Sequence, residues 1–178
     1  MRRCAWLLTF LSILAFRFSK NLLVGSKPLN VNNVQSRIRD WLDHFNLTVK
    51  SVSDADSHFF YIVTTDGGKK VSILRTKDQF SDYVLVKGLI SATPEDRKFL
   101  ESFTDDEKVE TRFAILLELS RAVMGYKSEK DVLEEITVFR RVPITPSLDE
   151  SEVFRLMWEV EAMLATIITV QATETHKL

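Results

Sequence analysis

Residues 47–90, LTVKSVSDADSHFFYIVTTDGGKKVSILRTKDQFSDYVLVKGLI, decide the fold of this chain of 178 residues. Two runs rich in β-branched and aromatic residues, 47–52 and 58–65, flank a polar turn and predict a hairpin. The glycines of the next turn accept positive φ, and residues 71–75 alternate between inward and outward positions after it. A fourth run covers residues 83–90, where Gly88 is read as a bulge or strand end. The stretch therefore predicts an antiparallel meander of four strands.

A helix is predicted immediately before the meander. Its apolar residues recur with the spacing of one helix face and are Val34, Ile38, Trp41, Leu42 and Phe45. Asn32 or Asn33 can cap its start, and charged residues occupy the other faces. We expect this helix to lie on the sheet with its polar side in water.

Two further helices are predicted after the meander. Thr93 precedes Pro94 and two acidic residues, which is typical of a helix start, and this short helix runs to Phe103. Thr104 and Glu107 form a capping box that begins a longer helix. Gly125 suits the left-handed residue that ends this helix. The predicted inner stripe of the longer helix consists of Val109, Phe113, Leu116, Leu117, Ser120, Val123 and Met124.

The remaining pattern is a strand and a closing helix. Residues 132–142 return to strand character and stop at Pro143, after which Ser147 or Asp149 caps the last helix. Its broad apolar stripe consists of Val153, Leu156, Met157, Val160, Met163, Leu164, Ile167 and Ile168. The predicted fold class is α+β: a helix, an antiparallel sheet of about five strands, tandem helices before the last strand, and a closing C-terminal helix. We expect one domain over residues 31–173 and a tail over 174–178.

Residues 1–30 form an apolar N-terminal extension that differs from this pattern. Arg2 and Arg3 precede an apolar run over residues 4–16, as in a signal peptide. Thirteen helical residues reach about 20 Å, short of a hydrocarbon core of roughly 30 Å. The extension is therefore a signal, an interfacial anchor or a mis-assigned start. We expect a cytoplasmic protein, or a membrane-associated or exported one if residues 1–26 are a genuine signal or anchor.

Composition narrows the classes of partner and site. The 24 Lys and Arg residues nearly balance the 25 Asp and Glu residues, so no global basic field favours nucleic acid. Cys4 is the only cysteine, which excludes an internal disulfide and a zinc cluster of cysteines from this chain alone. We therefore expect no nucleic-acid partner and no cofactor.

Four segments resemble an archaeal family of uncharacterised proteins whose fold is like that of class I type III secretion chaperones and YbjN-like proteins. These segments are residues 34–42 (VQSRIRDWL), residues 91–96 (SATPED) before Phe99 and Leu100, the helix over 113–124, and the closing helix over 154–168. The resemblance covers about residues 31–173. It implies a helix, a twisted antiparallel sheet and further helices, a unit that in the chaperones forms dimers and holds extended partner segments. It implies no catalytic residue, because fold alone does not fix function.

The spacing of histidine and acidic residues predicts no catalytic residue and no metal site. Neither His44, at the end of the first helix, nor His176 has metal-ligand spacing to another residue. Asp54, Asp56 and His58 are the nearest approach to a metal cluster, but a solvated turn explains them better, since the glycine and distal glutamate of a calcium loop are absent. The acidic residues 105–107 are explained by helix capping.

The leading hypothesis is therefore a noncatalytic interaction module, a homodimer that binds an extended peptide along a strand edge or in an apolar groove between sheet and helices. Small and apolar residues of the last helix are the predicted partner-binding set: Ala162, Met163, Ala165, Thr166 and Ile167. One alternative is an enzyme whose site gathers Arg75, Tyr61 and the turn over residues 54–58 on the sheet. Another is a membrane-associated domain anchored through residues 4–16, with membrane contact only if that segment is retained.

Overall fold

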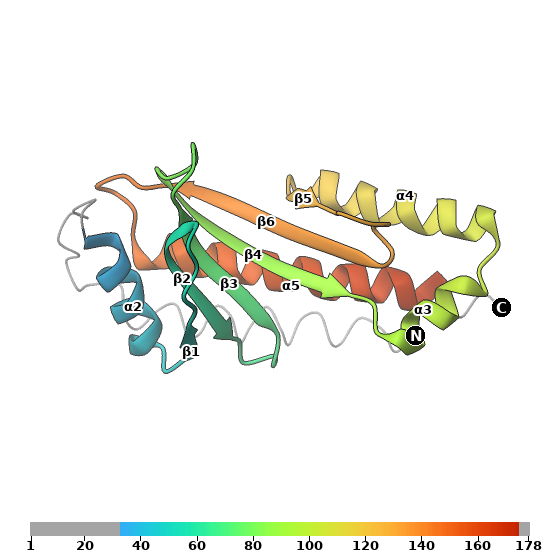
Figure 1. Cartoon of the computed structure of the whole chain (residues 1–178), viewed down its shortest axis with the longest axis horizontal. Helices are drawn as coiled ribbons and strands as arrows, with labels where there is room; N and C mark the ends of the chain where they lie inside the picture. The colour runs from blue at the N-terminus through green and yellow to red at the C-terminus, as the bar shows by residue number, and fades with distance from the viewer. Residues whose placement is uncertain (1–32, 175–178) are drawn as a thin grey trace, which may run out of the picture.

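The computed structural model describes residues 33–174 (Figure 1). The predicted N-terminal extension lies outside the described residues, as do residues 175–178 of the predicted tail. The chain forms, in order, α2 (Val34–His44), β1 (Thr48–Ser51), β2 (Ser57–Thr64), β3 (Lys70–Thr76), β4 (Tyr83–Ser91), α3 (Pro94–Glu101), α4 (Asp105–Arg121), β5 (Gly125–Lys127), β6 (Glu135–Pro143) and α5 (Glu150–Glu174). The fold class is α+β, as the sequence predicts.

The sheet is antiparallel throughout, and its strand order is β1-β2-β3-β4-β6-β5. The predicted meander forms the first four strands, and β6 returns beside β4 with an uninterrupted register from Tyr83 opposite Pro143 to Ser91 opposite Glu135. The sheet has six strands rather than about five because Gly125–Lys127 pairs with β6 as a short edge strand. Three residues are too few to carry a period, so the sequence pattern does not reveal this strand.

One face of the sheet is buried against helices. Figure 1 shows α5 running the length of the sheet on one side, with α2 at one end and α3 and α4 at the other. α5 packs on β3, β4 and β6, and also contacts α4. The core between these layers contains the inward strand residues Phe59, Tyr61, Val63, Val71, Ile73, Val84, Val86, Ile136, Val138 and Val142. Burial of these side chains is the main stabilising term of the fold.

Gly88 marks a close approach of helix and strand, and its interpretation as a bulge or strand end is wrong. The residue lies inside β4 and pairs with Val71 on one side and Val138 on the other. A Cβ at this position would lie 2.6 Å from Leu164 Cδ1 of α5. A larger residue here would force the Leu164 side chain to shift, because α5 rests directly on the strand.

Most predicted helix caps are present. Thr93 with Asp96 and Thr104 with Glu107 form reciprocal capping boxes at the starts of α3 and α4. Asp149 accepts a hydrogen bond from the Glu152 backbone N–H at 3.0 Å and caps α5. Asn33 is the N-cap residue of α2, but its side chain makes no capping bond. These local bonds fix where the helices begin.

The predicted inner stripe of α4 is only partly correct: Met124 is buried in the core and Leu116 packs against it, but most of the other predicted residues are exposed. The buried residues of this helix are Thr111, Ile115 and Leu119, whereas Val109 and Phe113 are exposed. The two sets have the same spacing and are offset by two residues, which puts them on nearly opposite sides of the helix. Tertiary packing selected the less apolar side.

The predicted end of α4 is also wrong. Val123, not Gly125, adopts positive φ, at 53°. Gly125 instead opens β5, where a Cβ would lie 2.3 Å from the ring of Phe139 on β6. The glycine therefore permits close strand pairing rather than a left-handed helix end.

Candidate functional site

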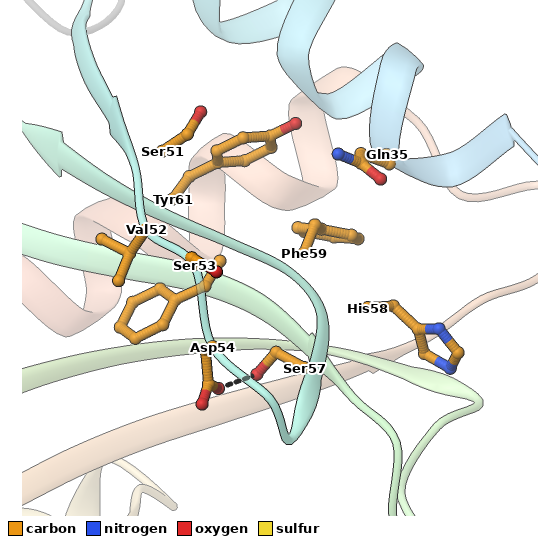
Figure 2. A pocket seen from close by; sticks show the side chains of 10 residues that line it. Gln35, Ser51, Val52, Ser53, Asp54, Ser57, His58, Phe59 and Tyr61 are labelled. Carbon is orange, nitrogen blue, oxygen red and sulfur yellow. Dashed lines mark hydrogen bonds between the residues drawn. The ribbon is translucent and has the colours of Figure 1, made fainter.

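A small pocket of about 190 Å³ lies where α2 meets the first hairpin. Its walls are Gln35 of α2, residues 51–54 of β1 and the following turn, and residues 57–61 of β2. Figure 2 shows the Tyr61 hydroxyl directed toward α2 and Gln35, while Asp54 turns back to Ser57 and His58 points to another side. The pocket therefore has polar walls that do not converge on one point.

The Asp54 carboxylate stabilises the turn rather than presenting a free base. It accepts the Ser57 hydroxyl at 2.5 Å and the Asp56 backbone N–H at 3.4 Å. The hydrogen bond from Ser57 is the main reason that the pKa of Asp54 lies below its usual value. This side chain is ionised near neutrality and already has its donors.

The residues of the enzyme alternative are only partly brought together. Asp54, His58 and Tyr61 line the pocket, but Arg75 does not, and its Nε donates to the Ser81 carbonyl at 2.6 Å. Tyr61 is buried and its ring stacks on Phe59 with centroids 5.3 Å apart. Within residues 33–174, no group of three or more His, Cys, Asp or Glu side chains could hold a metal ion. The pocket gives no specific support to a reaction.

The second feature is a sheet face on which no described helix packs. Strand alternation and register place one row of residues on it as Phe60, Leu74, Leu85 and Arg141. The neighbouring row is Lys50, Ile62, Ser72, Lys87 and Phe139. A solvated antiparallel face is normally polar, so the four half-buried apolar side chains on this face are unusual; Leu74 between them is buried. We call these two rows the uncovered face.

The third feature is an exposed apolar stripe on α4. Val109, Phe113 and Leu117 expose 60%, 66% and 37% of their surface and recur every four residues. Next to this stripe, Arg112 anchors α4 by donating through Nε to both carboxylate oxygens of Asp131 at 3.0 Å. We call these three residues the α4 stripe.

The predicted partner-binding set on α5 is divided between core and surface. Met163 and Ile167 are buried in the core, and so cannot contact a partner in this conformation. Ala162 is exposed, while Ala165 and Thr166 are half-buried. The Thr166 hydroxyl donates to the Ala162 carbonyl within the helix, at 3.0 Å. Partner contact by these three surface residues stays a prediction.

Sequence reasoning missed both the uncovered face and the α4 stripe. The sequence does contain a signal for the uncovered face, because residues 59–63 (FFYIV) form a continuous apolar run. Such a run indicates a strand that is apolar on both faces. The apolar residues of the α4 stripe were recognised in the sequence, but they were predicted to face the core rather than the solvent.

None of the described helices is long and apolar enough to span a membrane. The predicted anchor over residues 4–16 lies outside the described residues.

Comparison with known proteins gives structural neighbours and a family. The sequence matches none of the curated proteins. The fold is similar to that of an uncharacterised protein from Methanothermobacter thermautotrophicus, with a TM-score of 0.71, 16% identity, and coverage of 78% of this chain and 96% of that one. This likeness confirms the fold.

Two more distant structures are also similar. YbjN from E. coli gives a TM-score of 0.48 and 12% identity, over 84% of this chain and 97% of that one. A chain of the HopA1–SchA chaperone–effector complex gives a TM-score of 0.46 and 13% identity, over 82% of this chain and 99% of that one. These are the classes of protein that the sequence resemblance named. Residues 34–170 match the model of the uncharacterised conserved proteins DUF2299, and the chain belongs to that family.

Proposed function

We propose that this protein is a noncatalytic interaction module that holds a segment of a partner protein on the uncovered face of its sheet. The observation that carries the proposal is the apolar character of that face. Phe60, Ile62, Leu85 and Phe139 are only half-buried there, and Leu89 beside them exposes 58% of its surface. Apolar patches of this kind on a folded protein are typical of binding sites.

The geometry of the face suits an extended segment better than a compact ligand. The first row crosses four strands and the second crosses five, and neighbouring strands lie about 4.8 Å apart. The apolar side chains therefore form a flat band rather than an enclosed cavity. An extended chain lying across that band can set alternate side chains on it.

Selection from a random peptide library tests the proposal. Peptides selected on the native protein should lose binding to the Ile62→Ser variant, because Ile62 lies in the middle of the band. The matched control is Thr169→Ser, an exposed position on the far side of α5. A library that yields no peptide sensitive to Ile62→Ser would falsify the assignment of the face.

We also propose that the protein forms a homodimer through the α4 stripe. A two-fold axis through Phe113 sets Val109 of one copy at the level of Leu117 of the other, so the stripe is complementary to itself. The same antiparallel arrangement brings acidic Asp106, in the first turn, near basic Arg121, in the last turn. Sedimentation of a strict monomer at high concentration would count against the dimer.

We propose a cytoplasmic location for the folded domain. A chain whose only cysteine is Cys4 needs no oxidising compartment to fold. Detergent-free cell fractionation of the native protein tests this location, and recovery in the membrane fraction would favour an anchor within residues 1–26 instead.

A further inference from the structure

The uncovered face combines apolar side chains with two cations that form no ion pair with the described residues. Lys87 Nζ lies 5.4 Å from the centroid of the Phe60 ring. The Arg141 guanidinium carbon lies 3.9 Å from the Phe80 ring and 5.0 Å from the Phe139 ring. Among the ion pairs of residues 33–174, none involves Lys87 or Arg141. Both charges are held in place by aromatic rings and remain available to an anion.

The charge on this face is mostly positive. Register places Lys50 beside Ile62 and Lys70 beside Thr64 on the same side of the sheet. Among the described strand residues, strand alternation places one carboxylate on this side, that of Glu135. Glu135 pairs with Ser91 at one end of β6, whereas Arg141 lies near the other end. Asp54 and Asp78 act on Lys87 and Arg141 only as longer-range charges. The centre of the face is therefore apolar and cationic.

We infer that the uncovered face takes an extended protein segment in which acidic residues alternate with apolar ones. The inference rests on the proposed function and adds the chemistry of the ligand. Side chains of an extended segment point alternately to two sides, and those facing the sheet meet the apolar band. Its acidic side chains can reach over the band to Lys87 and Arg141, which form charge-assisted hydrogen bonds with carboxylates.

A single-stranded nucleic acid is the competing anionic ligand for an open sheet that carries aromatic residues. Such a ligand needs free aromatic faces on which to stack bases. On this sheet Lys87 lies over Phe60, while Arg141 lies over Phe80 and Phe139, so the charges cover rings that bases need. The aliphatic residues of the band, Ile62 and Leu85, offer no stacking surface. The overall charge of −1 adds no attraction for a polyanion.

Four fluorescent probes test the inference on the full chain. Three are peptides of about ten residues, a length that matches an extended strand. In these peptides phenylalanine and isoleucine alternate with glutamate, glutamine or lysine, and the fourth probe is a single-stranded RNA. By fluorescence anisotropy, the glutamate peptide should bind about tenfold more tightly than the glutamine peptide, as two exposed ion pairs would give. The lysine peptide should bind more weakly still. Added salt should reduce these differences.

Two variants separate charge from apolar contact. The double variant Lys87→Gln and Arg141→Gln should bind the glutamate and glutamine peptides equally, while Lys98→Gln with Lys130→Gln, at exposed positions away from the face, should keep the tenfold preference. Ile62→Ser should weaken binding of all three peptides.

Two results would overturn the inference. One is equal binding of the three peptides by the native protein, and the other is an RNA probe that competes with the glutamate peptide. Equal binding that Ile62→Ser still weakens would leave the proposed function standing. Absence of any peptide binding would count against both.

Discussion

Replacing Phe113 by serine should dissociate the proposed dimer without unfolding the protein. Phe113 exposes 66% of its surface in the single chain. Complete burial of a phenylalanine contributes about 1.5–3 kcal/mol, so burial of the exposed part contributes about 1–2 kcal/mol per copy. A symmetric dimer contains the contact from both copies, which gives about 2–4 kcal/mol and a Kd weakened by about thirtyfold to several hundredfold.

Sedimentation equilibrium over a wide range of concentration measures this Kd. Leu89→Ser is the matched control, because Leu89 exposes 58% of its surface but lies on the uncovered sheet face, away from α4. The control should leave the Kd unchanged. Urea unfolding of both variants should stay within about 0.5 kcal/mol of the native protein, as expected for exposed positions.

A charge exchange tests the antiparallel arrangement itself. Asp106→Arg should weaken the dimer by placing two cations together, and adding Arg121→Asp should restore it. Equal association of Phe113→Ser and the native protein would refute the proposed dimer, as would a native protein that remains monomeric at the highest concentration reached. A charge exchange without rescue would refute the antiparallel arrangement alone.

Three further predictions concern stability and are measured by urea unfolding. Gly88→Ala should cost about 1–3 kcal/mol, because the new Cβ would lie 2.6 Å from Leu164 Cδ1 in a packed core; an unchanged midpoint would mean that α5 can move away from β4. Thr104→Ala should cost about 1 kcal/mol through loss of the α4 capping box, and Thr104→Ser should restore most of it. Asp131→Asn should cost about 1–2 kcal/mol at pH 7 through loss of the charged pair with Arg112. The hydrogen bond from Arg112 lowers the pKa of Asp131 in the folded state, so this contribution is full above the unfolded pKa of about 4 and disappears as the pH falls through the lower folded value. The difference between Asp131→Asn and the native protein should therefore shrink below about pH 4, and a constant difference down to pH 2 would contradict the assignment.

Local patterns predicted most of the fold. The alternating runs predicted β2, β3 and β4 to within a residue or two, and the hydroxyl cap at Thr93 and the capping box at Thr104 predicted the starts of α3 and α4. These signals involve residues close together in the sequence, so they can be recognised without knowledge of tertiary contacts. The short strand β5 carried no such signal, because its pairing with β6 is its only definition.

The candidate surfaces were harder to predict. In α4, the set Val109, Phe113 and Leu117 is more apolar than the buried set Thr111, Ile115 and Leu119. Hydrophobic periodicity assigns the more apolar side of a helix to the core. This assignment is wrong when the more apolar side is exposed on the folded chain, for example at a contact with a partner. This mismatch between apolar character and burial is the observation on which the proposed α4 interface rests.

The α+β class, the order of the elements and the starts of most helices follow from the sequence alone, because periodicity, turns and caps are local properties. The buried side of α4, the need for small residues at Gly88 and Gly125, and the set of strand residues on the uncovered face follow only from the three-dimensional packing. These features depend on contacts between segments far apart in the chain: Leu164 over Gly88, Phe139 over Gly125, and Lys87 over Phe60. Sequence periodicity does not encode such contacts, so the proposed binding surface can be identified only from the assembled sheet.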